Sequence, residues 1–220
     1  TDNMALCGET IDYGPCAFMD IFAPDTVFSS IDHRGRYAYA NQPYIAQWNL
    51  ARLAETLLAF IDPDRKKAIE IAENCLNSFE KIYKEKWLTM MGSKIGLKER
   101  CEGDEKLISE LLDWMHKNSA DFTNTFINLG KEKLPDLEAY ATKDFQSWHS
   151  RWQERIRKEK QDRTATLGLM NSVNPLVIPR NHKVEEALQA AEENDLKPFH
   201  NLLQSLEKPY ENNGRLEGYQ

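Results

Sequence analysis

The sequence predicts a mainly α-helical protein, and three features of its 220 residues support this fold class. From Pro43 onward, apolar residues recur at intervals of three and four, which is the period of an amphipathic helix. Prolines, glycines and acidic turns interrupt this periodicity, so that it divides into separate helices. No strand signal of comparable strength and no repeat of fixed period is present in the sequence.

The first two helices are predicted from Pro43 to about Ile61 and from Ala68 to near Gly92. Pro43 suits the first position of a helix, where its missing N–H leaves no hydrogen bond unmade. The apolar positions of the first helix are Ile45, Trp48, Leu53, Leu57 and Phe60. After Asp62-Pro63-Asp64, the same period returns at Ala68, Ile71, Ala72, Cys75, Phe79, Ile82 and Tyr83. Both helices are therefore predicted to be amphipathic.

Six shorter helices are expected further along the chain. Their ranges are 107–115, 121–129, 137–140, 145–156, 184–194 and 198–206. Acidic Glu102 and Asp104 precede the first of them, and Asn174-Pro175 and Pro179 break the chain before the last two. The aromatic stripe Phe145, Trp148 and Trp152 is interpreted as core rather than as a surface that stacks on a ligand.

Residues 1–42 differ from the rest, because they are rich in Gly, Pro, Asp, Tyr and Phe and read as loops and turns. We therefore divide the chain into a loop-rich segment, 1–42, and a C-terminal helical bundle, 43–220.

Composition excludes several partners. The chain has 35 acidic and 28 basic side chains and a net charge of −7, so a broad attraction to nucleic acid or to an anionic membrane is not expected. No apolar run approaches the roughly 20 residues that span a bilayer, and the pattern of a secretory signal is not seen. The expected compartment is the cytoplasm.

The four cysteines are Cys7, Cys16, Cys75 and Cys101. They lie too far apart for a Cys-x-x-Cys zinc site and are too few for a disulfide scaffold in a chain of this length. We interpret them as buried or inert thiols, with a regulatory disulfide as the alternative.

Three polar residues of the loop-rich segment could carry chemistry. The side-chain oxygens of Asn3 and Asp12 suit a hard divalent cation such as Mg²⁺, which takes few protein ligands and completes its shell with water and phosphate. Asp2 could accept the proton of an attacking hydroxyl. The same residue types are also the commonest turn formers, so the residues alone leave both interpretations open.

The sequence resembles the selenoprotein O family, the kinase-like protein adenylyltransferases. The segments that carry the resemblance are Thr1-Asp2-Asn3-Met4, Thr10-Ile11-Asp12-Tyr13-Gly14-Pro15, Phe18-Met19-Asp20, Gly35-Arg36-Tyr37-Ala38-Tyr39, Asn41-Gln42-Pro43, Trp48-Asn49-Leu50 with Arg52-Leu53-Ala54, Met91 through Gly96-Leu97, and Val173-Asn174-Pro175 with Arg180-Asn181. They follow the order of that family and extend over nearly the whole chain.

The resemblance implies a fold, an activity and three residue roles. The fold would be the C-terminal helical lobe of a protein-kinase-like fold, with residues 1–42 ending its catalytic core. The activity would be transfer of AMP from ATP to Ser, Thr or Tyr hydroxyls of proteins, with Mg²⁺ or Mn²⁺. Asp2 would accept the proton, and Asn3 and Asp12 would bind the metal, with Asp12 also contacting ATP. The last two resemble the catalytic-loop Asn and the Asp-Phe-Gly Asp of protein kinases.

The sequence also departs from the family pattern. It contains no Gly-rich loop, phosphate-binding Lys or paired arginines of a nucleotide-binding lobe, and it ends without a cysteine or selenocysteine tail. We therefore expect the C-terminal portion of a longer enzyme whose N-terminal nucleotide-binding lobe is missing, and we expect the isolated chain to be inactive. The resemblance implies a cytoplasmic protein in a bacterium and a mitochondrial one in a eukaryote.

Two other functions stay open at this stage. A helical module that binds a partner protein without chemistry would explain the long helical part. Phosphoryl transfer would use the same ligand residues, because these residues alone do not decide which phosphorus is attacked.

Overall fold

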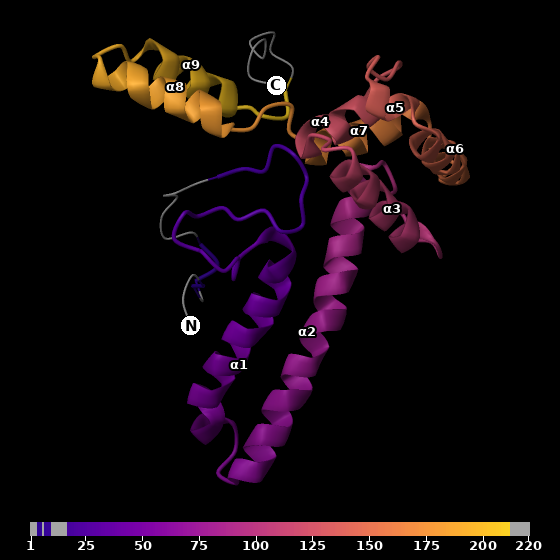
Figure 1. The fold of residues 1–220 in the computed structure, drawn as a ribbon. Coiled ribbons are helices and arrows are strands. Elements are labelled where there is room, and N and C mark those ends of the chain that lie inside the picture. The colour runs from indigo at the N-terminus through magenta and orange to yellow at the C-terminus, as the bar shows by residue number, and fades with distance from the viewer. Residues whose placement is uncertain (1–3, 6, 10–16, 212–220) are drawn as a thin grey trace. The chain divides into compact units, whose positions relative to one another are not determined.

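A computed structural model describes residues 4–5, 7–9 and 17–211 of the chain (Figure 1). Within these ranges the regular structure is helical, and no strand longer than an isolated bridge occurs. The elements are η1 (Tyr39–Asn41), α1 (Gln42–Ile61), α2 (Arg65–Lys94), α3 (Asp104–Lys117), α4 (Phe122–Gly130), α5 (Glu138–Ala141), α6 (Lys143–Lys158), α7 (Arg163–Val173), α8 (Asn181–Glu192) and α9 (Lys197–Leu206). The mainly α prediction is confirmed.

All eight predicted helices are present, and one further helix was not predicted. The missed helix is α7, which begins after Asp162, whose side chain accepts the backbone N–H of Ala165 at 2.7 Å. Only Leu167, Met170 and Val173 mark its apolar period, and Gly168 interrupts it. None of the described helices is both long enough and apolar enough to cross a membrane.

The chain divides into two compact units, each of which is described by itself. Unit 1 holds residues 24–87 and the described residues among 1–16, and unit 2 holds residues 17–23 and the described residues from 88 onward. The functional boundary predicted at residue 42 is a different kind of division and stays a prediction.

Unit 1 contains a hairpin formed by α1 and residues 65–87 of α2 (Figure 1). Gln47 Nε2 donates to the carbonyl oxygen of Leu76 at 3.3 Å, and Ala68 is completely buried. Several apolar side chains of the hairpin are nevertheless exposed, with Tyr44 at 72% and Phe60 at 86%. A substantial part of the predicted apolar surface is therefore not covered within unit 1.

Unit 2 has an aromatic core between α3, α5 and α6. Phe145, Trp148 and Trp152 are buried, as predicted, and the ring centroids of Trp114 and Phe145 lie 4.6 Å apart. The indole N–H groups of Trp148 and Trp152 donate to the carbonyl oxygens of Leu107 and Ile95, both at 2.8 Å. Because each indole is both buried and hydrogen-bonded, these contacts fix α6 against α3 and the end of α2.

The turn after α2 depends on a glycine. Gly96 has a φ of +82°, which L side chains rarely adopt, and a Cβ atom at this position would lie 2.7 Å from Cγ2 of Thr166. Backbone strain and a steric clash therefore coincide at one position.

We predict that Gly96→Ala lowers the free energy of unfolding by about 2–4 kcal/mol, the sum of left-handed strain and overpacking. The matched control is Gly168→Ala in α7, where a Cβ atom meets nothing within 4 Å. This control should stabilise the protein by about 0.5–1 kcal/mol, because alanine is the better helix former. Urea unfolding measures both changes, and equal effects of the two substitutions would contradict the prediction.

Candidate functional site

Asp2, Asn3 and Asp12, the residues predicted to carry the reaction, lie outside the described residues. The structure does describe the chain that follows Asp12, from Ala17 onward. The contacts therefore show how unit 2 holds residues 17–23, which follow the predicted metal ligand Asp12 in the sequence.

Residues 20–22 pair with residues 120–122 in unit 2. Ile21 and Asp121 form an antiparallel bridge. The N–H of Phe22 donates to the carbonyl oxygen of Ala120 at 3.0 Å, and the N–H of Phe122 donates to that of Asp20 at 2.7 Å. Phe22 is buried, and its ring stacks on that of Phe122 with centroids 5.8 Å apart.

A buried arginine reinforces this pairing. Nη1 of Arg180 donates to Oδ1 of Asp20 at 2.5 Å and to Oδ2 of Asp121 at 2.7 Å. The side chain of Arg180 is only 6% exposed, whereas that of Asp20 is 40% exposed. We call these three residues, Asp20, Asp121 and Arg180, the Arg180 clamp. Arg180 lies 160 positions after Asp20, so the clamp joins distant parts of the sequence.

Two residues of the clamp, Asp121 and Arg180, also stand at the starts of helices. Asp121 is the N-cap of α4, and its Oδ1 accepts the N–H of Asn124 at 2.7 Å. Arg180 precedes α8, and its carbonyl oxygen accepts the N–H of Val184 at 3.0 Å. Both residues are therefore held in place by their own helices, in addition to the ion pair.

The two carboxylates of the clamp keep the guanidinium of Arg180 charged. Burial by itself lowers the pKa of Arg180, but the hydrogen bonds that Arg180 donates to Asp121 and Asp20 outweigh this effect and raise the pKa above its ordinary value. A buried cation of this kind is tolerated only when it is paired, and here two carboxylates share one nitrogen.

Lys94, in the last turn of α2, lies next to the paired segment. Its Nζ lies 4.9 Å from the ring centroid of Phe126 and 5.7 Å from that of Phe122, and it donates to Oδ1 of Asn174 at 3.1 Å. Nδ2 of Asn174 returns a bond to the carbonyl oxygen of Lys94 at 2.8 Å. Burial lowers the pKa of Lys94 to about 8. Aromatic rings and an amide thus solvate this ammonium group.

A second buried arginine holds the loop at 98–103. Nε of Arg155 donates to Oδ1 of Asp104 at 2.7 Å, Nη2 donates to the carbonyl oxygen of Glu99 at 2.7 Å, and Nη1 lies 2.6 Å from Oε1 of Glu159. Hydrogen bonds to the carboxylates of Asp104 and Glu159 raise the pKa of Arg155 in spite of its burial. This network resembles the clamp in chemistry, but it contacts neither residues 17–23 nor α4.

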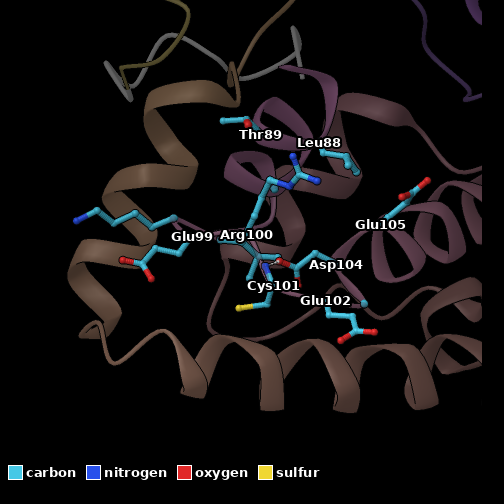
Figure 2. Close-up of a pocket in the computed structure, with 12 residues that line it drawn as sticks. Leu88, Thr89, Glu99, Arg100, Cys101, Glu102, Asp104 and Glu105 are labelled. Carbon is cyan, nitrogen blue, oxygen red and sulfur yellow. Dashed lines mark hydrogen bonds between the residues drawn. The ribbon is translucent and has the colours of Figure 1, made fainter. Parts of the chain in front are cut away.

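The loop borders a pocket of about 450 Å³ between the end of α2 and the start of α3. Figure 2 shows the carboxylates of Glu99, Glu102 and Glu105 pointing in different directions. Binding sites combine an apolar cavity with a few convergent polar groups, and such convergence is missing here. We interpret this pocket as a gap beside the loop.

Two segments that carry the family resemblance meet inside unit 1. The guanidinium carbons of Arg36 and Arg52 lie 4.6 and 5.4 Å from the ring centroid of Trp48. Nδ2 of Asn41 donates to the carbonyl oxygen of Gly35 at 2.8 Å. Two arginines on one indole are typical of cation–π packing and hold residues 35–41 close to α1.

The cysteines and metal-ligating side chains add no further site. Cys7, Cys75 and Cys101 are free and exposed, so these three thiols are not buried, and Cys16 lies outside the described residues. That they are inert stays a prediction. In the described part of the chain, no group of three or more His, Cys, Asp or Glu side chains is placed to hold a metal ion.

Sequence reasoning missed the Arg180 clamp. Asp20 and Arg180 each fall in a segment that resembles the family, but periodicity gives no information on a partner 160 positions away. The available signal was Asp121, which stands at the start of a predicted helix, where an N-cap residue is expected.

Comparison with known proteins gives first the class of protein. The relatives that match nearly the whole chain are named protein nucleotidyltransferase YdiU. That of Alcanivorax borkumensis is 56% identical over 211 residues, which is 96% of this chain and 44% of the relative. That of Pelagibacter ubique is 50% identical over 218 residues, 99% of this chain and 45% of the relative. That of Clostridium perfringens strain SM101 is 48% identical over 219 residues, all of this chain and 45% of the relative.

The family follows from a second comparison. The model of the family described as "Protein adenylyltransferase SelO" matches residues 1–207. The chain belongs to the SelO family, as its motifs predicted. It spans less than half of the length of the curated relatives it matches.

We predict a pH-dependent contribution of Lys94 to stability. The pKa of lysine is about 10.4 in an unfolded chain, and that of Lys94 is about 8 in the fold. Between these two pH values the unfolded chain binds a proton that the folded chain does not, so the fold gains stability as pH rises through this window.

Relative to Lys94→Met, the wild type should gain up to about 3 kcal/mol of unfolding free energy between pH 8 and pH 10.4. Urea unfolding at several pH values measures the difference. The matched control is Lys86→Met, at an exposed position of the same helix, which should show no such gain. A constant difference between wild type and Lys94→Met across the window would contradict the prediction.

Proposed function

We propose that this chain supplies the metal ligands and the proton acceptor of a protein adenylyltransferase, which transfers AMP from ATP to Ser, Thr or Tyr hydroxyls of proteins. The observation that supports this most strongly is the SelO family match, because it begins at residue 1 and so includes Asp2, Asn3 and Asp12. The name of the family states adenylyl transfer, and the names of the relatives state the wider nucleotidyltransferase class.

The donor set fits a hard cation. Asn3 offers an amide oxygen and Asp12 a carboxylate, and Mg²⁺ or Mn²⁺ takes such oxygens together with phosphate and water. The bound metal would neutralise negative charge on the phosphates and on the departing pyrophosphate. In this proposal Asn3 and Asp12 would hold the metal, and Asp12 would also contact ATP. Asp2 accepts the proton of the attacking hydroxyl.

The proposed partner within the enzyme is an N-terminal nucleotide-binding lobe of the same longer, kinase-like protein. One observation supports it: the chain spans 44–45% of the length of its relatives. The substrates would be proteins, and the isolated chain would be inactive.

We predict the label that a full-length protein transfers. With Mg²⁺ and a protein substrate, label on the α-phosphate of ATP should be retained on the substrate, and label on the γ-phosphate should not. Retained γ-label would instead support phosphoryl transfer. If neither label is retained, the result counts against both transfers and favours the helical interaction module.

Substitutions in the full-length protein then test the role proposed for each residue. Asp2→Asn should lower kcat about 100-fold or more, because the proton acceptor is lost. Asp12→Asn should raise the Mg²⁺ concentration required for half-maximal rate. Asp25→Asn, at an exposed position, is the control and should leave both quantities unchanged. Equal activity of Asp12→Asn and wild type at every Mg²⁺ concentration would contradict the role of Asp12.

A further inference from the structure

We propose that an exposed surface of unit 1, built around Trp48, binds an acidic segment of a partner protein. The surface consists of Tyr44, Trp48 and Arg52 of α1 together with Arg36 of the preceding loop, and we call it the Trp48 surface. All four residues are described and belong to unit 1. The inference does not depend on the proposed function.

The first step of the argument is the face of α1 that these residues share. Tyr44, Trp48 and Arg52 follow one another at intervals of four, so they lie on one face of the helix in successive turns. Tyr44 is largely exposed, and Trp48 and the side chain of Arg52 are each 40% exposed. Trp, Tyr and Arg are the residue types that contribute most binding energy at protein interfaces. The composition of this face therefore favours a protein partner.

The second step is the orientation of Arg36. Its guanidinium carbon lies 4.6 Å from the ring centroid of Trp48 and 5.7 Å from that of Tyr37. The carboxylate of Asp32 attracts Arg36, but its two oxygens accept the backbone N–H groups of Arg36 and Tyr37 at 2.8 and 2.7 Å. Within the described ranges the guanidinium itself makes no hydrogen bond. Because a stacked guanidinium keeps its in-plane N–H groups available, Arg36 is an oriented cation with unused donors.

The third step is the second cation, Arg52. Its guanidinium carbon lies 5.4 Å from the same centroid of Trp48, and its Nη2 lies 2.7 Å from Oε1 of Glu55. Both side chains of this pair are substantially exposed, and such surface pairs contribute little to stability. A carboxylate of a partner can therefore replace Glu55 at small cost.

The local charge is complementary to an acidic partner. Residues 26–61 contain three arginines and only two acidic residues, Asp32 and Glu55, in a chain whose net charge is −7. An acidic segment is therefore repelled by the chain as a whole and attracted to this one stretch, which favours binding at the Trp48 surface over other positions.

An extended peptide fits the arrangement of the two arginines. In such a peptide, carboxylates two positions apart lie on the same side, about 6.4–6.8 Å from each other. Two guanidinium groups that are both within 5.4 Å of one centroid can match this spacing. A nucleotide is a poorer fit, because nucleotide sites are concave and bury most of their ligand, whereas Arg36 and Trp48 are exposed.

We predict that the full-length protein binds a dye-labelled peptide with Glu at every second position, and that it binds the same peptide with Gln in place of Glu about 10-fold more weakly or less tightly still. Arg36→Gln and Arg52→Gln should each raise the Kd for the Glu peptide about 10-fold, as loss of an interface arginine does. Fluorescence anisotropy measures each Kd.

Arg65→Gln is the matched control. Arg65 is an exposed arginine of unit 1 that follows the far end of α1, so this variant removes the same charge away from the Trp48 surface. It should leave the Kd unchanged. Arg36→Lys keeps the charge but loses the planar stacked group, so it should weaken binding. Binding by Arg36→Lys as tight as that of wild type would indicate attraction between charges without a formed site, and would overturn the inference.

The remaining outcomes also decide the matter. No binding of the Glu peptide by wild type overturns the inference, as does an equal loss of binding in Arg65→Gln and Arg36→Gln. Displacement of the peptide by an equal concentration of ATP would assign the surface to phosphate instead. Urea unfolding should be unchanged in Arg36→Gln and Arg52→Gln. A clear loss of stability in both would show that this surface packs within the protein, and the inference would fail.

These measurements contain no transfer reaction. A full-length protein that binds the Glu peptide at the Trp48 surface and transfers no AMP would overturn the proposed function alone. A protein that transfers AMP and does not bind this peptide would overturn the present inference alone.

Discussion

The described structure depends on a buried positive charge that two carboxylates share. Arg180 stands before α8, Asp121 caps α4, and Asp20 belongs to the short segment that follows the predicted metal ligand. A guanidinium in this position is stable only while it is paired, because an unpaired buried charge is strongly destabilising. The same contact therefore supports the packing of unit 2 and holds residues 17–23 within that unit.

Much of the fold could be predicted because helices are local structures. The apolar period from Ile45 to Phe60 and the aromatic stripe of α6 depend only on residues close together in the sequence, and eight of the nine α-helices in the described ranges follow from such patterns. The helix α7 was not predicted, because its short apolar stripe contains Gly168. The clamp could not be predicted, because the attraction between Asp20 and Arg180 arises only when the fold brings them together. The predicted ligands Asp2, Asn3 and Asp12 lie outside the described residues and rest on the family match.

The two units differ in how fully they bury their apolar side chains. Unit 2 encloses Phe145, Trp148 and Trp152, whereas unit 1 leaves Phe60, Tyr44 and Ile82 exposed on its hairpin. The chain also spans less than half of the length of its relatives. Burial of a large apolar side chain stabilises a fold by about 1.5–3 kcal/mol, so these exposed side chains contribute less to stability than the buried ones of unit 2.

The most direct test of the account is electron paramagnetic resonance of Mn²⁺ bound to the full-length protein with ATP. The account predicts protein-bound Mn²⁺ whose affinity is weakened in Asp12→Asn and unchanged in the control Asp25→Asn. Equal Mn²⁺ affinity in the wild type and both variants would contradict the claim that Asp12 binds the metal.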